Sequence, residues 1–491
     1  MTLPHSCHIF MFPFQWTIDT MAQERFGEQI SFRNIKSSKA LQNWERVYKP
    51  NSEEDKVTLY NEKNYFYDFV HDALYDNGKN DNTNIVRHYE RIEPRRNAVH
   101  YIVKNASKVY KLDVKSITLN LYSTGVGVLS FTLNNYAYDE LEDILNINQF
   151  GRRVYPPYYK SKELDNPFSE LPKLIKIDGL NGCYEEDFQS YGPDDTNKPA
   201  AFLQKMVHEV AANISVKSVI DDRMYCMSWY KNNDLVCKLC DDANNDYKHS
   251  EEWYKYVFVD WSSCTCQDNE MLESLIKDAT YARWRKWHSL YGISRYSFVM
   301  LTNAGESESY LYDNFESMYV RMAELILVQK ASVLRFSAEV TNISSMEDNL
   351  KGASMTERMR SLYKEYIRFI NQIHFRESSA QDQAIELYNM LYNTANLKEQ
   401  VEKLDNEIEE LYHYVSLVED KQNSKMMSHL TFIATLFVPA TFVAGVFGMN
   451  NDIGDYLNYC FGNIYNSLIF QLGLVFVSLF VLLVWYLKKK K

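Results

Sequence analysis

Two charge-free apolar runs near the C-terminus constrain this chain more than any other feature. Residues 430–447 (LTFIATLFVPATFVAGVF) and 468–487 (LIFQLGLVFVSLFVLLVWYL) contain no Asp, Glu, Lys or Arg. A helix over the first run extends about 27 Å, close to the thickness of the hydrocarbon core of a bilayer. Trp485 and Tyr486 end the second run, where aromatic residues mark the lipid–water interface. We predict two membrane-spanning helices. The alternative, a pair of buried core helices, does not explain the lysines that follow.

The basic residues predict the orientation of this hairpin. Lys421 and Lys425 precede the first run and 488–491 is all lysine, whereas the loop 448–467 has no Lys or Arg. Because basic residues concentrate on the cytoplasmic side, we expect a multi-pass protein of the cell inner (plasma) membrane. Both termini, including the basic tail 488–491, are then cytoplasmic, and the loop faces outside.

The composition of the chain excludes several functions. Its 491 residues carry a formal net charge of −12, so we expect no direct nucleic-acid binding, which needs a basic surface. No P-loop, H-E-x-x-H or nucleophile elbow occurs, so we do not expect an enzyme. The N-terminal apolar stretch lacks a basic region, and we expect no cleavable signal peptide.

Small and hydroxylated residues follow one face of the first run. Alternating steps of three and four place them on one helical stripe: Ser424, Met427, Thr431, Ala434, Val438, Thr441 and Gly445. Such residues let helices approach closely and offer oxygen atoms inside the membrane. The stripe is either a packing seam or the lining of a narrow pore built from several copies of this helix.

A helical pattern without Gly or Pro precedes the first run, from about Ala380 to Ser428. Its apolar residues keep heptad spacing and need a partner helix: Leu397, Val401, Leu404, Ile408, Leu411, Val415 and Val418. Helical patterns at 308–341 and 356–375 supply partners. We therefore predict a helical hairpin at 306–377 and a stalk helix at 378–429 that continues into the first span, so that movement of the body would reach the stripe.

Residues 1–305 predict a mixed α/β domain. Alternating apolar residues indicate a strand at 9–16 (IFMFPFQW) and a hairpin at 117–133, and apolar runs suggest strands at 256–261 (YVFVDW) and 296–301 (YSFVML). A helix is expected between the last two, at about 269–287. We expect this domain to be cytoplasmic and to carry any regulatory ligand.

Residues 423–450, NSKMMSHLTFIATLFVPATFVAGVFGMN, resemble the stalk-to-pore segment of the CorA family of divalent-cation channels. The shared features are a Pro-x-Thr-Phe run at 439–442 and the tripeptide Gly448-Met449-Asn450. The resemblance implies a funnel-shaped homopentamer with an α/β cytoplasmic domain, a long helical stalk and a central pore lined by the first spans. It also implies that the tripeptide forms an outer ring that meets hydrated Mg²⁺, an ion that gives up its waters reluctantly.

This chain departs from the family pattern at two places. A Met-Pro-Glu element usually follows the tripeptide, whereas this chain has NDIGDYLNY, in which Asp452 and Asp455 would attract the cation. Ser424 stands at the inner-pore position where the family usually has Asn. We therefore expect Mg²⁺ or a related divalent cation, transported or regulatory.

The large N-terminal domain resembles divergent CorA-like proteins encoded beside type III CRISPR systems. These are thought to be membrane effectors of antiviral defence, opened by a nucleotide second messenger. Basic and aromatic residues alternate around 281–301 and suit a phosphate-and-base ligand. Candidate ligand residues are Trp284, Arg285 and Arg295, with Arg152 and Arg153. The alternative is a solvated helix edge followed by a core strand, and a non-conducting membrane scaffold is a third interpretation of the chain.

Two weaker patterns each allow an ion-binding interpretation beside a purely structural one. Cys237, Cys240, Cys264 and Cys266 suggest a four-thiolate zinc site, with buried free thiols as the alternative. Arg87, Arg91, Arg95 and Arg96 indicate a solvated face or an ion-pair network, with phosphate binding as the alternative.

Overall fold

The computed structural model describes residues 3–19, 30–50, 52–80, 83–157, 171–188, 191, 198–241, 246–303, 308–345 and 352–448, with the single residues 459 and 473. The chain divides into two compact units. The first comprises Met1–Ser345 and Glu357–Glu410, and the second comprises Met346–Thr356 and Leu411–Lys491.

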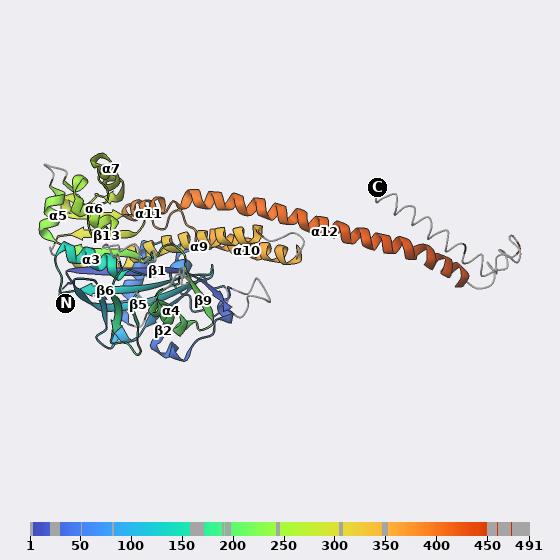
Figure 1. Cartoon of the computed structure of the whole chain (residues 1–491), viewed down its shortest axis with the longest axis horizontal. Coiled ribbons are helices and arrows are strands. Elements are labelled where there is room, and N and C mark those ends of the chain that lie inside the picture. The colour runs from blue at the N-terminus through green and yellow to red at the C-terminus, as the bar shows by residue number, and fades with distance from the viewer. Residues whose placement is uncertain are drawn as a thin grey trace, which may run out of the picture. The chain divides into compact units, whose positions relative to one another are not determined.

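One mixed sheet organises the first unit (Figure 1). Its described strands follow the order β11-β12-β13-β10-β1-β6-β5-β4-β7-β8, with β3 pairing with β5 and β2, and β9 pairing with β1. All pairs are antiparallel except β10 with β13. The strands are β1 (Ser6–Ile18), β2 (Trp44–Arg46), β3 (Val86–Arg91), β4 (His100–Lys104), β5 (Val109–Tyr122), β6 (Val126–Asn135), β7 (Leu174–Asp178), β8 (Glu185–Glu186), β9 (Ile214–Ser218), β10 (Tyr225–Lys231), β11 (Thr280–Tyr281), β12 (Ser289–Ile293) and β13 (Ser297–Thr302).

Helices cover both faces of this sheet. The described α-helices are α1 (Glu53–Tyr65), α2 (His71–Leu74), α3 (Leu141–Gly151), α4 (Ala201–Val210), α5 (Asn233–Cys240), α6 (Glu251–Phe258), α7 (Asn269–Ala279), α8 (Glu308–Asn314), α9 (Val320–Ser344), α10 (Gly352–Gln372), α11 (Asp382–Thr394) and α12 (Leu397–Gly448). A π-helical turn, Phe315–Tyr319, joins α8 to α9.

The predicted hairpin at 117–133 is confirmed as β5 and β6. Gly125 has φ +74°, a conformation that glycine adopts without the steric cost of a side chain, and it turns the chain between the two strands. On β5, Leu119 and Leu121 join the apolar core with α3 and α4, while Asn120 and Tyr122 bond to Glu324 of α9. This alternation places α9 on the face opposite α3 and α4.

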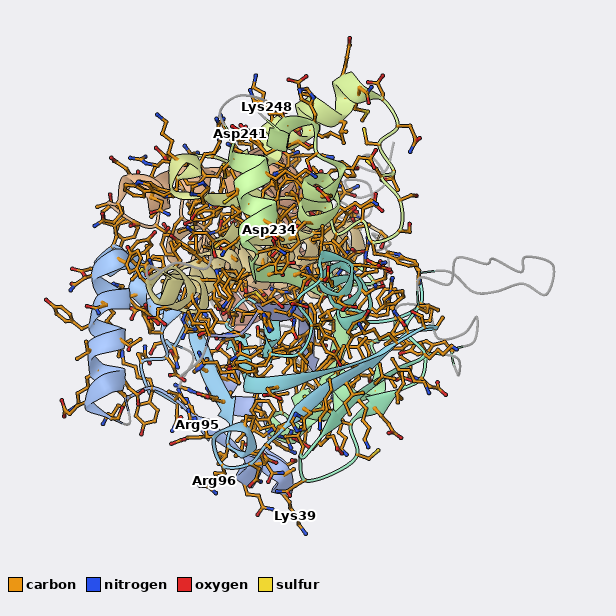
Figure 2. All side chains as sticks on the ribbon, turned by 90° about the vertical axis from the view of Figure 1, so that its left-hand side faces the viewer. Lys39, Arg95, Arg96, Asp234, Asp241 and Lys248 are labelled. Atoms are coloured by element: carbon orange, nitrogen blue, oxygen red, sulfur yellow. The ribbon has the colours of Figure 1, made fainter. Side chains whose placement is uncertain are left out.

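A second apolar core lies where α5, α6 and α7 pack beside β12 and β13. Figure 2 shows Asp234, Asp241 and Lys248 at this end of the unit, away from Arg95 and Arg96. The predicted strand at 256–261 is wrong, because residues 256–258 form the end of α6 and Val259 caps that helix in the left-handed conformation. Ser250 accepts a hydrogen bond from the Trp253 amide and begins this helix, and short apolar runs alone do not separate buried helix from strand.

The stalk is not one helix from Ala380, as the sequence predicted. α11 ends at Thr394 and α12 begins at Leu397, because Asn396 has φ 51° in the left-handed region that Asn tolerates. Its side chain donates to Glu399 Oε2 at 2.9 Å. The uninterrupted helix therefore begins at Leu397 and runs to Gly448.

The predicted heptad seam is confirmed in the first turns of α12. Leu397, Val401, Leu404 and Ile408 are buried. Lys330 of α9 donates to Gln400 Oε1 at 2.6 Å and to the Ala395 carbonyl at 3.1 Å. The predicted partner segment 308–341 thus contacts the start of α12.

Candidate functional site

The predicted stripe lies on α12, and its described side chains are exposed. Ser424, Met427, Thr431, Ala434, Val438 and Thr441 all face solvent, and Gly445 lies in the same helix. Large apolar side chains around them are also exposed: Met426, Leu430, Ile433 and Phe437. Contiguous apolar surface of this kind marks a site that another surface covers.

The hydroxyl groups near the stripe are oriented by their own helix. Thr431 donates to the Met427 carbonyl at 2.7 Å, and Thr441 donates to the Phe437 carbonyl at 2.8 Å. A hydroxyl that donates its proton to the backbone keeps acceptor lone pairs on the outer side. The stripe therefore presents acceptor oxygens and methyl groups, which suit a hydrated cation better than an anion.

Most of the predicted membrane region after Gly448 lies outside the described residues. Among the described residues, no helix is both long enough and apolar enough to cross a bilayer. Met449, Asn450, Asp452 and Asp455 lie outside the described residues, as does the predicted span 468–487 apart from residue 473. Gly448 is the last residue of α12.

Arg152 and Arg153 meet a third arginine that the sequence interpretation missed. Both follow α3 and are almost fully buried. The backbone of Arg153 forms an isolated antiparallel β-bridge with that of Arg223, in the segment before β10. Arg153 pairs with Asp222, and Arg223 Nε donates to Asp221 Oδ2 at 3.0 Å. The adjacent Asp-Asp-Arg triplet was the available sequence signal, but it does not reveal that β10 starts beside the end of α3.

Arg152 has the poorest set of partners in this arginine cluster (Arg152, Arg153 and Arg223). Among the described residues it donates only to the Gln149 side chain at 3.3 Å and to the Tyr296 carbonyl at 3.4 Å, and its buried Nε has no partner there. Burial and the nearby Arg223 lower the pKa of Arg152 to about 10. A guanidinium held this way remains charged at neutral pH and lacks a carboxylate, which makes it the group in the cluster that most favours an anion.

The basic and aromatic segment does not converge on this arginine cluster. The Trp284 and Trp287 rings stack on each other with centroids 5.0 Å apart, and the Arg285 guanidinium lies 5.9 Å from the Tyr247 ring. Arg295 is exposed and adjoins Tyr296, whose carbonyl accepts from Arg152. Of the predicted ligand residues, only Arg295 thus lies next to Arg152 and Arg153.

The zinc interpretation is corrected by the structure. In the described part of the chain, no three His, Cys, Asp or Glu side chains lie close enough to hold a metal ion together. Cys237 is exposed while Cys240 is buried, and the Cys264 thiol donates to the Cys266 carbonyl at 3.3 Å. The two cysteines on α5 therefore lie in different environments, and the four cysteine side chains do not form a common site.

Two arginines of the run at 87–96 form the predicted ion pairs, Arg91 at the end of β3 and Arg95 on the 3-10 turn that follows it. Arg91 is fully buried and pairs with Glu93 and Glu209. Arg95 pairs with Glu45 and Glu90 at the surface. These pairs account for Arg91 and Arg95. Arg87 is buried, donates to the Asn80 carbonyl at 3.2 Å and has an Nε without a hydrogen-bond partner among the described residues.

Residues 309–489 match the family model described as CorA-like Mg²⁺ transporter protein. The C-terminal region is thus similar to CorA-like transporters. It is similar to the "Putative metal ion transporter YfjQ" of Bacillus subtilis (strain 168), with 38% identity over 76 residues, which is 16% of this chain and 22% of the relative. It is also similar to the "Cobalt/magnesium transport protein CorA" of Thermotoga maritima (strain ATCC 43589 / DSM 3109 / JCM 10099 / NBRC 100826 / MSB8), with 40% identity over 78 residues, which is 16% of this chain and 20% of the relative.

The chain thus spans about a fifth of the length of the curated relatives that it matches. The family model and both relatives are named as metal-ion transporters. The match begins at α8 and includes α9 to α12, whereas the sheet and α1 to α7 precede it. The N-terminal domain is therefore the part of the chain whose chemistry must be argued from its own residues.

Proposed function

We propose that this chain is the subunit of a homopentameric membrane channel for Mg²⁺ or a related divalent cation. The observation that carries the proposal is the exposed stripe on α12, which lies inside the segment that matches a transporter family. In this proposal 430–447 and 468–487 cross the inner membrane, both termini are cytoplasmic, and five copies of the stripe line the pore.

The proposed path places polar oxygen atoms where a hydrated cation needs them. Gly448, Met449 and Asn450 form the outer ring, whose carbonyl and amide oxygens bind the ion's water shell without removing it. Asp452 and Asp455 raise the local cation concentration at the mouth. Since α12 is one helix from Leu397 to Gly448, a displacement of its first turns is transmitted along the helix to the stripe.

Cation uptake by proteoliposomes tests this proposal. We expect the full chain to take up Mg²⁺, and Asn450→Ala to change the flux or its selectivity among divalent ions. Asn371→Ala is the matched control, since Asn371 is exposed on α10 and bonds only within that helix. Unchanged flux and selectivity in Asn450→Ala would refute the outer ring, and no uptake by well-folded oligomers would favour the non-conducting scaffold.

A second candidate function is a ligand-gated effector of antiviral defence, opened by a nucleotide second messenger. The buried, poorly partnered guanidinium of Arg152 beside Arg153 and Arg223 favours it, because phosphate groups bind such clusters. We expect the full chain to bind AMP, and the double variant Arg152→Gln/Arg153→Gln to lose this binding while Arg368→Gln on α10 keeps it. Equal binding by all three proteins would exclude the cluster as the nucleotide site. A gene neighbourhood without type III CRISPR genes would argue against the defence role.

A further inference from the structure

A cavity of about 350 Å³ lies in the first unit, beside α1 and away from the arginine cluster described above. Its walls come from α1, α2, the strands β2 and β3 with the segments that follow them, and the first turn of α9. Arg95 lines the cavity too, and Figure 2 shows it at the edge of the unit on the turn after β3. The cavity volume suits a small organic molecule rather than a single ion.

Arg321 of α9 reaches this cavity without donating a hydrogen bond to any described residue. Its guanidinium Nε lies 3.8 Å from Glu62 Oε2, which is too long for a hydrogen bond, and the side chain is 24% exposed. The Tyr75 ring lies 5.6 Å from the guanidinium carbon. The carboxylates of Glu62 and Glu324 lie near enough to attract this guanidinium, but neither accepts a hydrogen bond from it among the described residues. A guanidinium has five donors, so those of Arg321 are available to a further partner.

Glu62 of α1 supplies the opposite charge to Arg321 in the cavity wall, and it too has few hydrogen bonds. Its carboxylate is 12% exposed, and among the described residues it accepts one long hydrogen bond, of 3.3 Å, from the Tyr75 hydroxyl. The other carboxylates in the cavity wall already have partners. Asp76 accepts from Arg46 at 2.7 and 2.8 Å and from Asn84 at 3.0 Å, Asp55 accepts from the Ser52 amide at 3.0 Å, and Glu90 pairs with Arg95. Arg321 and Glu62 therefore lie side by side with spare hydrogen-bonding capacity, among carboxylates that are already bonded.

The charge arrangement selects the class of ligand. A simple anion would be attracted by Arg321 but repelled by Glu62. A simple cation would be attracted by Glu62 but repelled by Arg321. A zwitterion satisfies both groups, and two charge-assisted hydrogen bonds then replace one long ion pair. Leu59, Leu74 and Tyr48 supply apolar wall beside these charges. His88 adds no charge at neutral pH, because burial lowers its pKa to about 4.

We propose that this cavity binds a free α-amino acid, with its carboxylate on Arg321 and its ammonium group on Glu62. The side chain of the ligand lies against the apolar wall. This site is separate from the ion path and does not depend on which cation the protein carries.

The place of Arg321 in the fold gives such binding a consequence. Arg321 lies two residues after the π-helical turn Phe315–Tyr319, and π-helical turns are frequent at functional sites. α9 is also the helix whose Lys330 holds Gln400 at the start of α12. An occupied cavity therefore fixes the first turn of α9, and α9 contacts the first turns of α12.

Calorimetric titration of the full detergent-solubilised chain with the twenty proteinogenic L-amino acids tests the proposal. We expect at least one to bind, and its N-acetyl and its amide analogues to bind at least about tenfold more weakly, since each lacks one of the two charges. Arg321→Gln and Glu62→Gln should weaken binding by about tenfold or more, while Arg368→Gln, an exposed position on α10, leaves it unchanged.

Three outcomes would overturn the proposal. No amino acid binds at about 5 mM, a concentration far above that at which such a buried charge pair would saturate. The N-acetyl analogue binds as well as its parent, which would indicate a plain anion site. Both analogues bind as well as the parent, which would indicate an apolar site. The comparison of analogues uses the unaltered protein, so it decides the question even where Arg321→Gln fails to fold, and it is independent of whether the protein conducts ions.

Discussion

Removing the Arg91 side chain should destabilise the first unit strongly. Arg91 is fully buried; it donates to Glu209 Oε2 at 2.7 Å, to Glu93 at 3.0 and 3.1 Å, and to the Tyr184 hydroxyl oxygen at 2.9 Å. The guanidinium also lies between the Trp44 and Tyr184 rings. Among the described residues, Arg91 is the only cation that pairs with Glu93 or Glu209.

The expected magnitude follows from what Arg91→Met leaves behind. Two buried carboxylates lose their counter-charge, and breaking a buried pair in this way costs about 3–5 kcal/mol of unfolding free energy. For a domain of this size that corresponds to a fall of roughly 5–15 °C in the unfolding temperature. Adding Glu209→Gln should recover at least about 1 kcal/mol, because a neutral amide needs no counter-charge.

Thermal unfolding of the full chain, followed by circular dichroism at pH 7.5, measures these effects. Lys238→Gln is the control, since Lys238 pairs with Glu252 at the surface with its side chain 59% exposed, and such pairs contribute under about 1 kcal/mol. An unfolding temperature of Arg91→Met within about 2 °C of the unaltered protein would refute the reasoning. So would a double variant that is less stable than Arg91→Met.

Three further predictions concern the stalk, the arginine cluster and the pore. Asn396→Val should lower stability by about 1–2 kcal/mol while Asn396→Gly changes it by less than about 1 kcal/mol, because a β-branched residue resists the left-handed conformation; thermal unfolding of both variants checks this, and equal stability would contradict it. Burial and Asp221 raise the pKa of Asp222 to about 6, so the folded state binds this proton more tightly than the unfolded chain does. Stability should therefore rise as pH falls from about 6 to 4, and sulfate titrations should show tighter binding at pH 5.5 than at pH 7.5, because protonated Asp222 releases Arg153. Thr441→Val should reduce Mg²⁺ flux into proteoliposomes by roughly three- to tenfold through loss of one acceptor oxygen, and unchanged flux would remove Thr441 from the pore lining.

Local patterns predicted much of the fold. Alternating apolar residues identified β1, β5 and β6, and the heptad spacing identified the buried positions Leu397 to Ile408. The strand proposed at 256–261 was wrong because a short apolar run fits a buried helix equally well. The break at Asn396 was missed because Asn signals a left-handed residue far less reliably than Gly does.

The sequence by itself determined the CorA-like C-terminal region, since apolar runs, the stripe and the tripeptide are contiguous along the chain. Only the tertiary structure decided which polar groups of the N-terminal domain meet. Arg152 and Arg223, or Glu62 and Arg321, are brought together by sheet and helix packing between distant segments, and whether a charge is paired depends on that packing. The same packing separated the four cysteines and enclosed Arg91. A charged residue's type is written in the sequence, but its partner, its burial and hence its pKa arise only in three dimensions.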